Sequence, residues 1–143
     1  MLKPGVYPKD AFNLVSVISE FLSRLSPEDG AVATFIGVAK SSSESKKEVS
    51  EVEVESYIEH ATPTIQKICE EVRVKHQASN VLIYHFTGSF KVGEPLVLVL
   101  VSGNSRSNVF PALKEAVERY KREPALFKKE VFADGSSRWV SHA

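Results

Sequence analysis

Three elements of regular structure follow one another in LVLVLVSGNSRSNVFPALKEAVERYKREPALFKKEVF, residues 96–132. The first, LVLVLVS (96–102), is almost wholly apolar and predicts a strand that is buried on both faces. Pro124 ends the helix that follows, and residues 126–132 predict a further strand. The helix is indicated by apolar residues that recur at helical spacing: Val109, Phe110, Leu113, Ala116, Val117 and Tyr120. This succession indicates a fold that combines helices with a sheet.

On the N-terminal side, helices and strands are also predicted in turn. Asp10 is the expected N-cap of a first helix, because apolar residues recur at helical spacing from residue 11 to residue 25. A second helix is expected over residues 63–76. A strand is expected over residues 31–39, where Gly37 suggests a bulge or a close backbone approach. A second strand is expected over residues 51–57, where valines alternate with glutamates. A third is expected over residues 80–86 and is followed by a turn region over residues 87–95.

The C-terminal end predicts a hairpin, since Asp134-Gly135 is a turn signal before a last strand over residues 137–140. The resulting order, α-β-β-α-β-β-α-β-β, predicts an α+β fold around a mixed or antiparallel sheet. No internal repeat or linker interrupts the chain, so we expect one domain over residues 1–143. The serine-rich segment 40–50 is almost free of apolar residues and predicts a mobile surface loop.

The composition excludes several classes of protein. The 143 residues are 43% hydrophobic and 25% charged, with 18 Lys and Arg against 18 Asp and Glu, so the formal net charge is zero. No global charge draws the chain to nucleic acid or to an anionic membrane. The N-terminus MLKPGVYPKD has no apolar core of a signal peptide, and the longest apolar stretch is far shorter than the ~20 residues of a membrane-spanning helix. A cytoplasmic protein is expected.

Common catalytic and metal-binding motifs are absent from the sequence. One cysteine, Cys69, excludes an internal disulfide and a thiolate metal site, and its place on an apolar helical stripe predicts a core residue. The four histidines show no ligand spacing, so no metal is expected. His85, within an apolar strand, is expected to be a buried and hydrogen-bonded imidazole rather than a functional group. Glu53 and Glu55 are expected on a solvated strand face.

Two groups of basic residues are the candidates for chemistry. Arg106 stands at the start of a predicted helix, where free N–H groups and the helix dipole favour anions. Lys121 and Lys128 stand on either side of Pro124, which turns the chain, so both could point into one cleft. Clustered ammonium groups lower each other's pKa, which suits a nucleophile or a proton carrier. The alternatives are a solvated arginine beside an N-cap and a solvated basic corner.

An ordered set of motifs relates the chain to a known family. His85 and Gly88 precede Gly93-Glu94, and S-R-S, two lysines seven residues apart and Arg138-Trp139 follow. With this set the chain resembles the large, catalytic subunit of molybdopterin synthase. The matching stretches are GAVATFIGVAK (30–40), VEVESY (52–57), IYHFTGSFKVGEPLVLVLVSGNSRSNVF (83–110), YKREPALFKKE (120–130) and DGSSRWV (134–140).

The resemblance implies an α/β-hammerhead-like fold with an additional small antiparallel β subdomain. It implies a central homodimer that carries one small ubiquitin-like subunit at each end, with the Gly-Gly tail of that subunit ending in a thiocarboxylate. Such a sulfurtransferase moves two sulfurs into cyclic pyranopterin monophosphate and forms the dithiolene of molybdopterin, a step of molybdenum cofactor biosynthesis. No metal, nucleotide or other cofactor is needed in that step.

The resemblance also implies roles for single residues. Lys121 and Lys128 match the two active-site lysines of the family, and Arg106 matches an arginine that contacts the anionic substrate. Arg138 is taken as a further substrate-binding residue.

Three further positions depart from the family pattern. Lys40 stands where the family usually has arginine, which keeps the charge but loses the planar fork. Ser105, also in the expected substrate site, stands where the family often has histidine. Ala143 replaces an arginine that some relatives offer across the dimer, a role that His142 could take.

Other functions remain open from the sequence alone. The chain could be a catalytically silent relative that only binds the small subunit, or an α+β module whose basic corner binds an anionic metabolite. A nucleic-acid module is disfavoured because the aromatic residues among the basic ones, Tyr120 and Phe127, are predicted to be buried. A homodimer is also expected because the strands over 83–101 carry more apolar surface than a monomer of this size hides.

Overall fold

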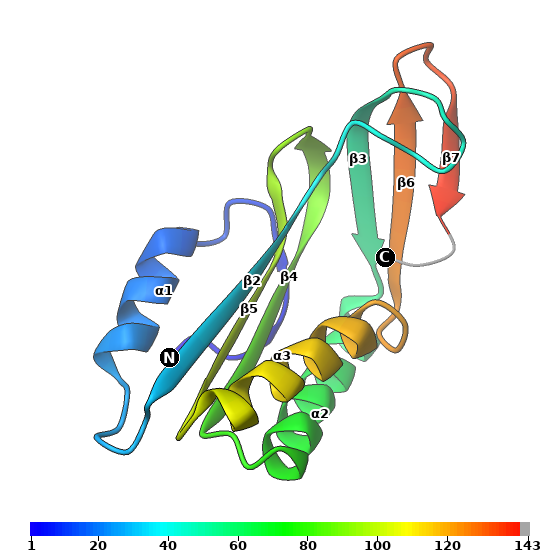
Figure 1. The fold of residues 1–143 in the computed structure, drawn as a ribbon. Coiled ribbons are helices and arrows are strands. Elements are labelled where there is room, and N and C mark those ends of the chain that lie inside the picture. The colour runs from blue at the N-terminus through cyan, green and yellow to red at the C-terminus, as the bar shows by residue number, and fades with distance from the viewer. Residues whose placement is uncertain (141–143) are drawn as a thin grey trace.

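The computed structural model describes residues 1–140. Helices and strands alternate along the chain, and the α+β prediction is confirmed (Figure 1). In chain order the elements are β1 (Gly5–Pro8), α1 (Leu14–Ser23), β2 (Ala31–Val38), β3 (Val49–Ser56), α2 (Ile58–Lys75), β4 (Asn80–Lys91), β5 (Pro95–Gly103), α3 (Arg106–Tyr120), β6 (Leu126–Phe132) and β7 (Ser137–Val140). Within residues 1–140, no helix is both long and apolar enough to cross a membrane.

The strands form one sheet in the order β2-β5-β4-β3-β6-β7, and the short strand β1 pairs with β4. That last pair is parallel, and all the other described pairs are antiparallel. The long strand β4 belongs to both halves of the sheet, since its residues 80–85 pair with β5 and its residues 88–91 pair with β3. The changeover occurs at Gly88, whose φ of +127° is accessible to glycine and strained for other residues.

Helices cover both faces of the larger half of the sheet, which contains β1, β2, β5 and the first part of β4. On one face, α2 and α3 pack against alternate residues of β4 and β5, and on the other face α1 packs against the residues between them. Strand β5 is therefore buried on both faces, as predicted. Burial of one large aliphatic side chain contributes about 1.5–3 kcal/mol, so this three-layer core carries most of the stability.

The smaller half consists of β3, β6 and β7 together with the end of β4, and it projects beyond the helices in Figure 1. It is the small antiparallel part that the resemblance implied. One side of this half packs around Val52, Val54 and Phe90, whereas Phe127 faces outward and is 52% exposed. The prediction that Phe127 is buried is wrong, because alternation along β6 places it on the outer face.

Two features at the N-terminal end differ from prediction. Helix α1 begins after Asn13, whose side chain accepts a hydrogen bond from the backbone N–H of Ser16 at 3.0 Å, so Asn13 rather than Asp10 is the N-cap. Asp10 instead has a φ of +67° in the turn before the helix. Strand β1 was not predicted, because four residues are too few to show a period.

Helix α2 begins five residues before Pro63. The first part of the helix is held by tertiary contacts, since Ala61 is fully buried and the Thr62 hydroxyl accepts a hydrogen bond from the backbone N–H of Val6 at 3.1 Å. Strand β4 continues through the predicted turn region as far as Lys91, and the turn is confined to the residues around Gly93. The strand continues because β3 supplies a new partner where pairing with β5 ends.

The apolar strands over 83–101 are covered within the chain. The reason given for a homodimer is therefore wrong, because helices hide this surface on both sides. The exposed apolar side chains lie elsewhere, and three of them are on the edge strand β2: Val32, Ile36 and Val38.

Candidate active site

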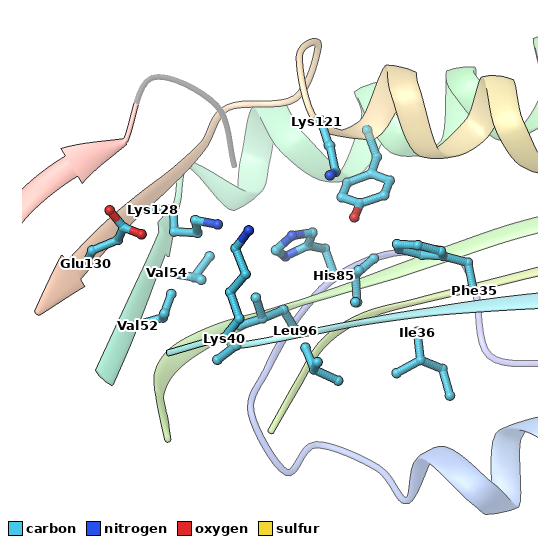
Figure 2. Close-up of a pocket in the computed structure, with 15 residues that line it drawn as sticks. Phe35, Ile36, Lys40, Val52, Val54, His85, Leu96, Lys121, Lys128 and Glu130 are labelled. Carbon is cyan, nitrogen blue, oxygen red and sulfur yellow. The ribbon is translucent and has the colours of Figure 1, made fainter. Parts of the chain in front are cut away.

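A pocket of about 370 Å³ opens where the C-terminal end of α3 meets the junction between the two halves of the sheet. Its walls come from β2, β3, β4, β5, β6 and the last turn of α3 (Figure 2). The bulge predicted at Gly37 is present, and a Cβ atom there would lie 2.7 Å from Cγ1 of Val97 and 3.6 Å from the hydroxyl of Tyr120. Glycine therefore leaves space in this wall of the pocket.

Three lysines line the pocket, and Figure 2 shows their amino groups directed toward the same space. Lys40 lies two residues after β2, Lys121 is the C-cap of α3, and Lys128 lies on β6. The chain leaves α3, turns at Pro124 and returns as β6, which brings Lys121 and Lys128 to the same cleft. The prediction that these two lysines share a cleft is confirmed.

Lys128 is the least exposed of the three lysines, since it is half-buried whereas Lys40 and Lys121 are exposed. Burial lowers the pKa of Lys128 from its usual value, and the positive charges of Lys121 and Lys40 lower it further. The carboxylate of Glu130 acts in the opposite direction and is outweighed. Lys128 therefore releases its proton at a lower pH than a solvated lysine does.

Glu130 is a buried carboxylate in the wall of the pocket, two residues from Lys128 on the same face of β6. It accepts hydrogen bonds from the hydroxyl of Ser43 at 2.7 Å and from Nε of Arg138 at 3.1 Å. Arg138 is thus paired with Glu130 and does not itself line the pocket. The bond to Ser43 attaches the segment between β2 and β3 to the site, and the predicted mobility of residues 40–50 stays a prediction.

His85 also lines the pocket, a placement that the sequence argument did not anticipate. Its Nδ1 lies 3.1 Å from the carbonyl oxygen of Phe86, and since a carbonyl can only accept, Nδ1 carries the proton. Burial lowers the pKa of His85 to about 4, and the charge of Lys128 contributes. The expected buried, hydrogen-bonded imidazole is confirmed. The sequence signal for this location is that Val81, Ile83 and His85 alternate along the strand and so share one face, and His85 is the polar residue at the end of that series.

Arg106 and Ser105 lie at the opposite end of α3 from the pocket. Ser105 is the N-cap, and its hydroxyl donates to Oδ1 of Asn108 at 3.1 Å, while Arg106 is exposed. The 15-residue helix rises about 1.5 Å per residue, so roughly 20 Å separates these residues from Lys121 of the same chain. Their roles in substrate binding stay predictions. The expectations for His142 and Ala143 lie outside the described residues.

The remaining candidates are structural. Cys69 is buried in the core, as predicted, and burial raises the pKa of its thiol to about 12. Glu53 forms an ion pair with Lys129 at 3.0 Å on the outer face of the small half of the sheet, and Glu55 is exposed. Within residues 1–140, no three or more His, Cys, Asp or Glu side chains gather in a way that could hold a metal ion.

Comparison with known proteins places the chain in a family. The family model described as MoaE protein matches residues 8–123. The chain belongs to the MoaE family. Among curated relatives, the molybdopterin synthase catalytic subunits of Bos taurus and of Nostoc sp. are each 32% identical. The bovine match covers 80% of this chain and 60% of that protein, and the Nostoc match covers 98% and 86%.

Solved structures of other proteins share the fold. The crystal structure of molybdopterin synthase from Staphylococcus aureus matches with a TM-score of 0.87 at 25% identity, over 99% of both chains. A complex of subunits 1 and 2 of molybdopterin-converting factor from Helicobacter pylori matches with a TM-score of 0.70 at 14% identity, over 96% of this chain and 89% of that one. This MoaE-family chain spans about 60% of the length of the bovine relative.

Proposed function

We propose that this chain is a molybdopterin synthase catalytic subunit. It transfers sulfur from the C-terminal thiocarboxylate of a small ubiquitin-like subunit to cyclic pyranopterin monophosphate and forms the molybdopterin dithiolene. The observation that carries the proposal is the convergence of Lys40, Lys121 and Lys128 on one pocket in a protein of zero formal net charge. Membership of the MoaE family supports it.

The charge of the pocket suits the two reactants. The phosphate of the pterin and the thiocarboxylate of the carrier tail are both anions, and each charge-assisted hydrogen bond contributes about 1.5–3 kcal/mol. Lys40 and Lys121 are exposed at the pocket and hold these anions. A cavity of about 370 Å³ is within the range of small-molecule sites.

The reaction also needs a group that moves protons. Sulfur displaces oxygen at the pterin side chain, so protons must be delivered to one atom and removed from another. The lowered pKa of Lys128 brings its amine closer to neutral pH, where proton transfer by a side chain is most efficient. Lys121 and Lys128 are the proposed catalytic residues, and Lys40, Ser105, Arg106 and Arg138 are the proposed substrate-binding residues.

The proposed partners are the small sulfur-carrier subunit and a second copy of this chain. The Helicobacter pylori structure is itself a complex of two different subunits. For the homodimer, the exposed apolar side chains of the edge strand β2 offer a surface that a second copy could cover. The proposed place of action is the cytoplasm.

A sulfur-transfer assay tests the function. Wild-type protein, thiocarboxylated small subunit and cyclic pyranopterin monophosphate should give the dithiolene, and Lys121→Ala should reduce the rate by about 100-fold or more while the protein stays folded. The matched control is Arg122→Ala, which removes the adjacent cation outside the pocket and should keep nearly full activity. Dithiolene formation by Lys121→Ala at the wild-type rate would remove the catalytic role.

A catalytically silent relative is the second candidate. It is favoured by two departures from the family pattern. Lys40 stands where the family usually has arginine, and Ser105 stands where it often has histidine. Such a protein binds the small subunit and produces no dithiolene in the same assay. A metabolite-binding module, by contrast, has no affinity for a partner that ends in Gly-Gly.

A further inference from the structure

Two polar atoms of buried residues that line the pocket have no hydrogen-bond partner among residues 1–140: Nε2 of His85 and the hydroxyl oxygen of Tyr120. Both side chains are 3% exposed. No described side-chain nitrogen or oxygen is both sealed from solvent and unpaired, so these two atoms reach the open space of the pocket. Polar atoms that face the interior of a pocket and have no partner in the protein are free to bind a ligand there.

The chemical character of each atom follows from its surroundings. Since Nδ1 of His85 carries the proton for Phe86, Nε2 of the neutral ring holds a lone pair and accepts a hydrogen bond. The ring stays neutral at pH 7 because burial and the charge of Lys128 lower its pKa to about 4. The Tyr120 hydroxyl can donate. The two rings lie with centroids 5.6 Å apart, so the acceptor and the donor are neighbours.

Nε2 of His85 cannot bind the anionic part of a guest. A lone pair repels a phosphate or a carboxylate oxygen, whereas a donor N–H or O–H is attracted to it. Figure 2 shows the imidazole of His85 among the amino groups of Lys40, Lys121 and Lys128, which take the negative charge. The pocket therefore has a cationic part and an uncharged part that presents an acceptor beside a donor.

We infer that His85 and Tyr120 form a recognition pair: Nε2 of His85 accepts a hydrogen bond from an uncharged N–H or O–H group next to the anion of the guest, and the Tyr120 hydroxyl donates to a neighbouring acceptor. This inference rests on the proposed function. The group has two possible sources, a peptide unit of the carrier tail or the heterocycle and side chain of the pterin, and both combine a donor with an acceptor.

Binding measurements on isosteric variants test the pair. Tyr120→Phe removes only the hydroxyl. His85→Asn keeps a donor near the position of Nδ1 but has no acceptor at the position of Nε2, and His85→Gln restores an acceptor there. The probes are a peptide with the C-terminal sequence of the carrier ending in Gly-Gly carboxylate and, separately, cyclic pyranopterin monophosphate, each titrated calorimetrically.

Tyr120→Phe and His85→Asn should each weaken one of the two probes by about 2- to 12-fold, the value of one neutral hydrogen bond, and His85→Gln should recover part of the affinity. The probe that is weakened identifies the source of the group. The melting temperature of Tyr120→Phe should not fall, because no described residue bonds its hydroxyl. The control is Tyr84→Phe, which removes a hydroxyl that donates to the carbonyl of Leu2 at 2.7 Å and should lower stability without changing either affinity.

The outcomes separate the inference from the function. If wild-type protein binds both probes and both variants bind them equally well, a water molecule fills the pair and the inference is overturned while the function stands. If wild-type protein binds neither probe, the proposed function fails and the inference fails with it.

Discussion

Lys128 and Lys129 are adjacent on β6, yet they have opposite surroundings. Successive side chains of a strand point to opposite faces, so Lys128 enters the pocket while Lys129 lies on the outer face, paired with Glu53 at 3.0 Å and over the ring of Trp139. The same residue type thus serves two purposes one position apart. Both lysines are partly buried, but only the inward one lies beside other cations, and its pKa is lowered first by burial and then by those charges.

This contrast gives a prediction for the pair. Lys128→Ala should lower kcat/KM for sulfur transfer by about 10²- to 10⁴-fold, the usual range for removal of a proton-transfer group, with little change in the free energy of unfolding. Lys129→Ala should lower it less than threefold, because Lys129 does not line the pocket, and its surface ion pair with Glu53 contributes only about 0–1 kcal/mol to stability. Steady-state kinetics and urea denaturation of both variants provide the measurement. Equal losses from the two substitutions would contradict the assignment of Lys128.

Individual residues of the pocket also show how much of the site could be predicted from the sequence. The two lysines around Pro124 could be assigned to one cleft because proline forces the chain to turn between them. His85 could not be assigned to it, because a single histidine in an apolar strand is usually a core residue. Its place in the pocket depends on where α3 ends above β4, which is a tertiary property that no local pattern contains.

At the scale of elements, the end of β2 shapes the pocket through Gly37. A side chain at this position would meet Cγ1 of Val97, a residue that is itself 1% exposed and has little room to move. The packing of β2 against Val97 of β5 at this point therefore depends on a residue without a Cβ atom. The sequence indicated a bulge or a close approach here, and both are present.

Gly37→Ala should lower the free energy of unfolding by about 1–3 kcal/mol through overpacking. The same substitution should cost clearly less in a protein that already carries Val97→Ala, because the methyl group in conflict is then absent. Guanidinium denaturation of the wild type, both single variants and the double variant measures the coupling. Additive effects would show that the new methyl group meets something other than Val97.

Other elements show why the first and last residues of helices and strands were harder to predict than the presence and type of each element. The expected helices and strands are all present, because their periods extend over many residues. Strand β1 was not predicted, and the errors in the bounds of the predicted elements were the start of α1, the start of α2 and the end of β4. The start of α2 and the end of β4 depend on partners distant in sequence, namely the contact of Thr62 with Val6 and the pairing of Gly88 with Val54, whereas the start of α1 is set by the local cap of Asn13.

For the molecule as a whole, His85 links the pocket to acid stability. In the folded protein the pKa of His85 is about 4, against 6.5 for a free histidine. The unfolded chain therefore takes up a proton below pH 6.5 that the folded protein does not take up until about pH 4. Stability from this group is complete above pH 6.5 and is lost as the pH falls through that window.

The predicted loss is about 3 kcal/mol between pH 6.5 and pH 4, at about 1.4 kcal/mol per unit of pKa. The free energy of unfolding of His85→Gln, which cannot be protonated, should fall less over the same range by about that amount. Urea denaturation at a series of pH values gives both curves. Parallel curves for the two proteins would mean that the pKa of His85 is the same in the folded and the unfolded protein.

The division of β4 between two halves of the sheet has a mechanical consequence. Lys40 and Lys121 belong to the larger half with its helices, whereas Lys128 is carried by β6 in the smaller half. The continuous strand β4, with a glycine at position 88, joins the two halves of the sheet that carry these lysines. A change in the angle between the two halves moves the amino group of Lys128 relative to those of Lys40 and Lys121. The electrostatic field that these charges produce in the pocket therefore depends on the curvature of β4.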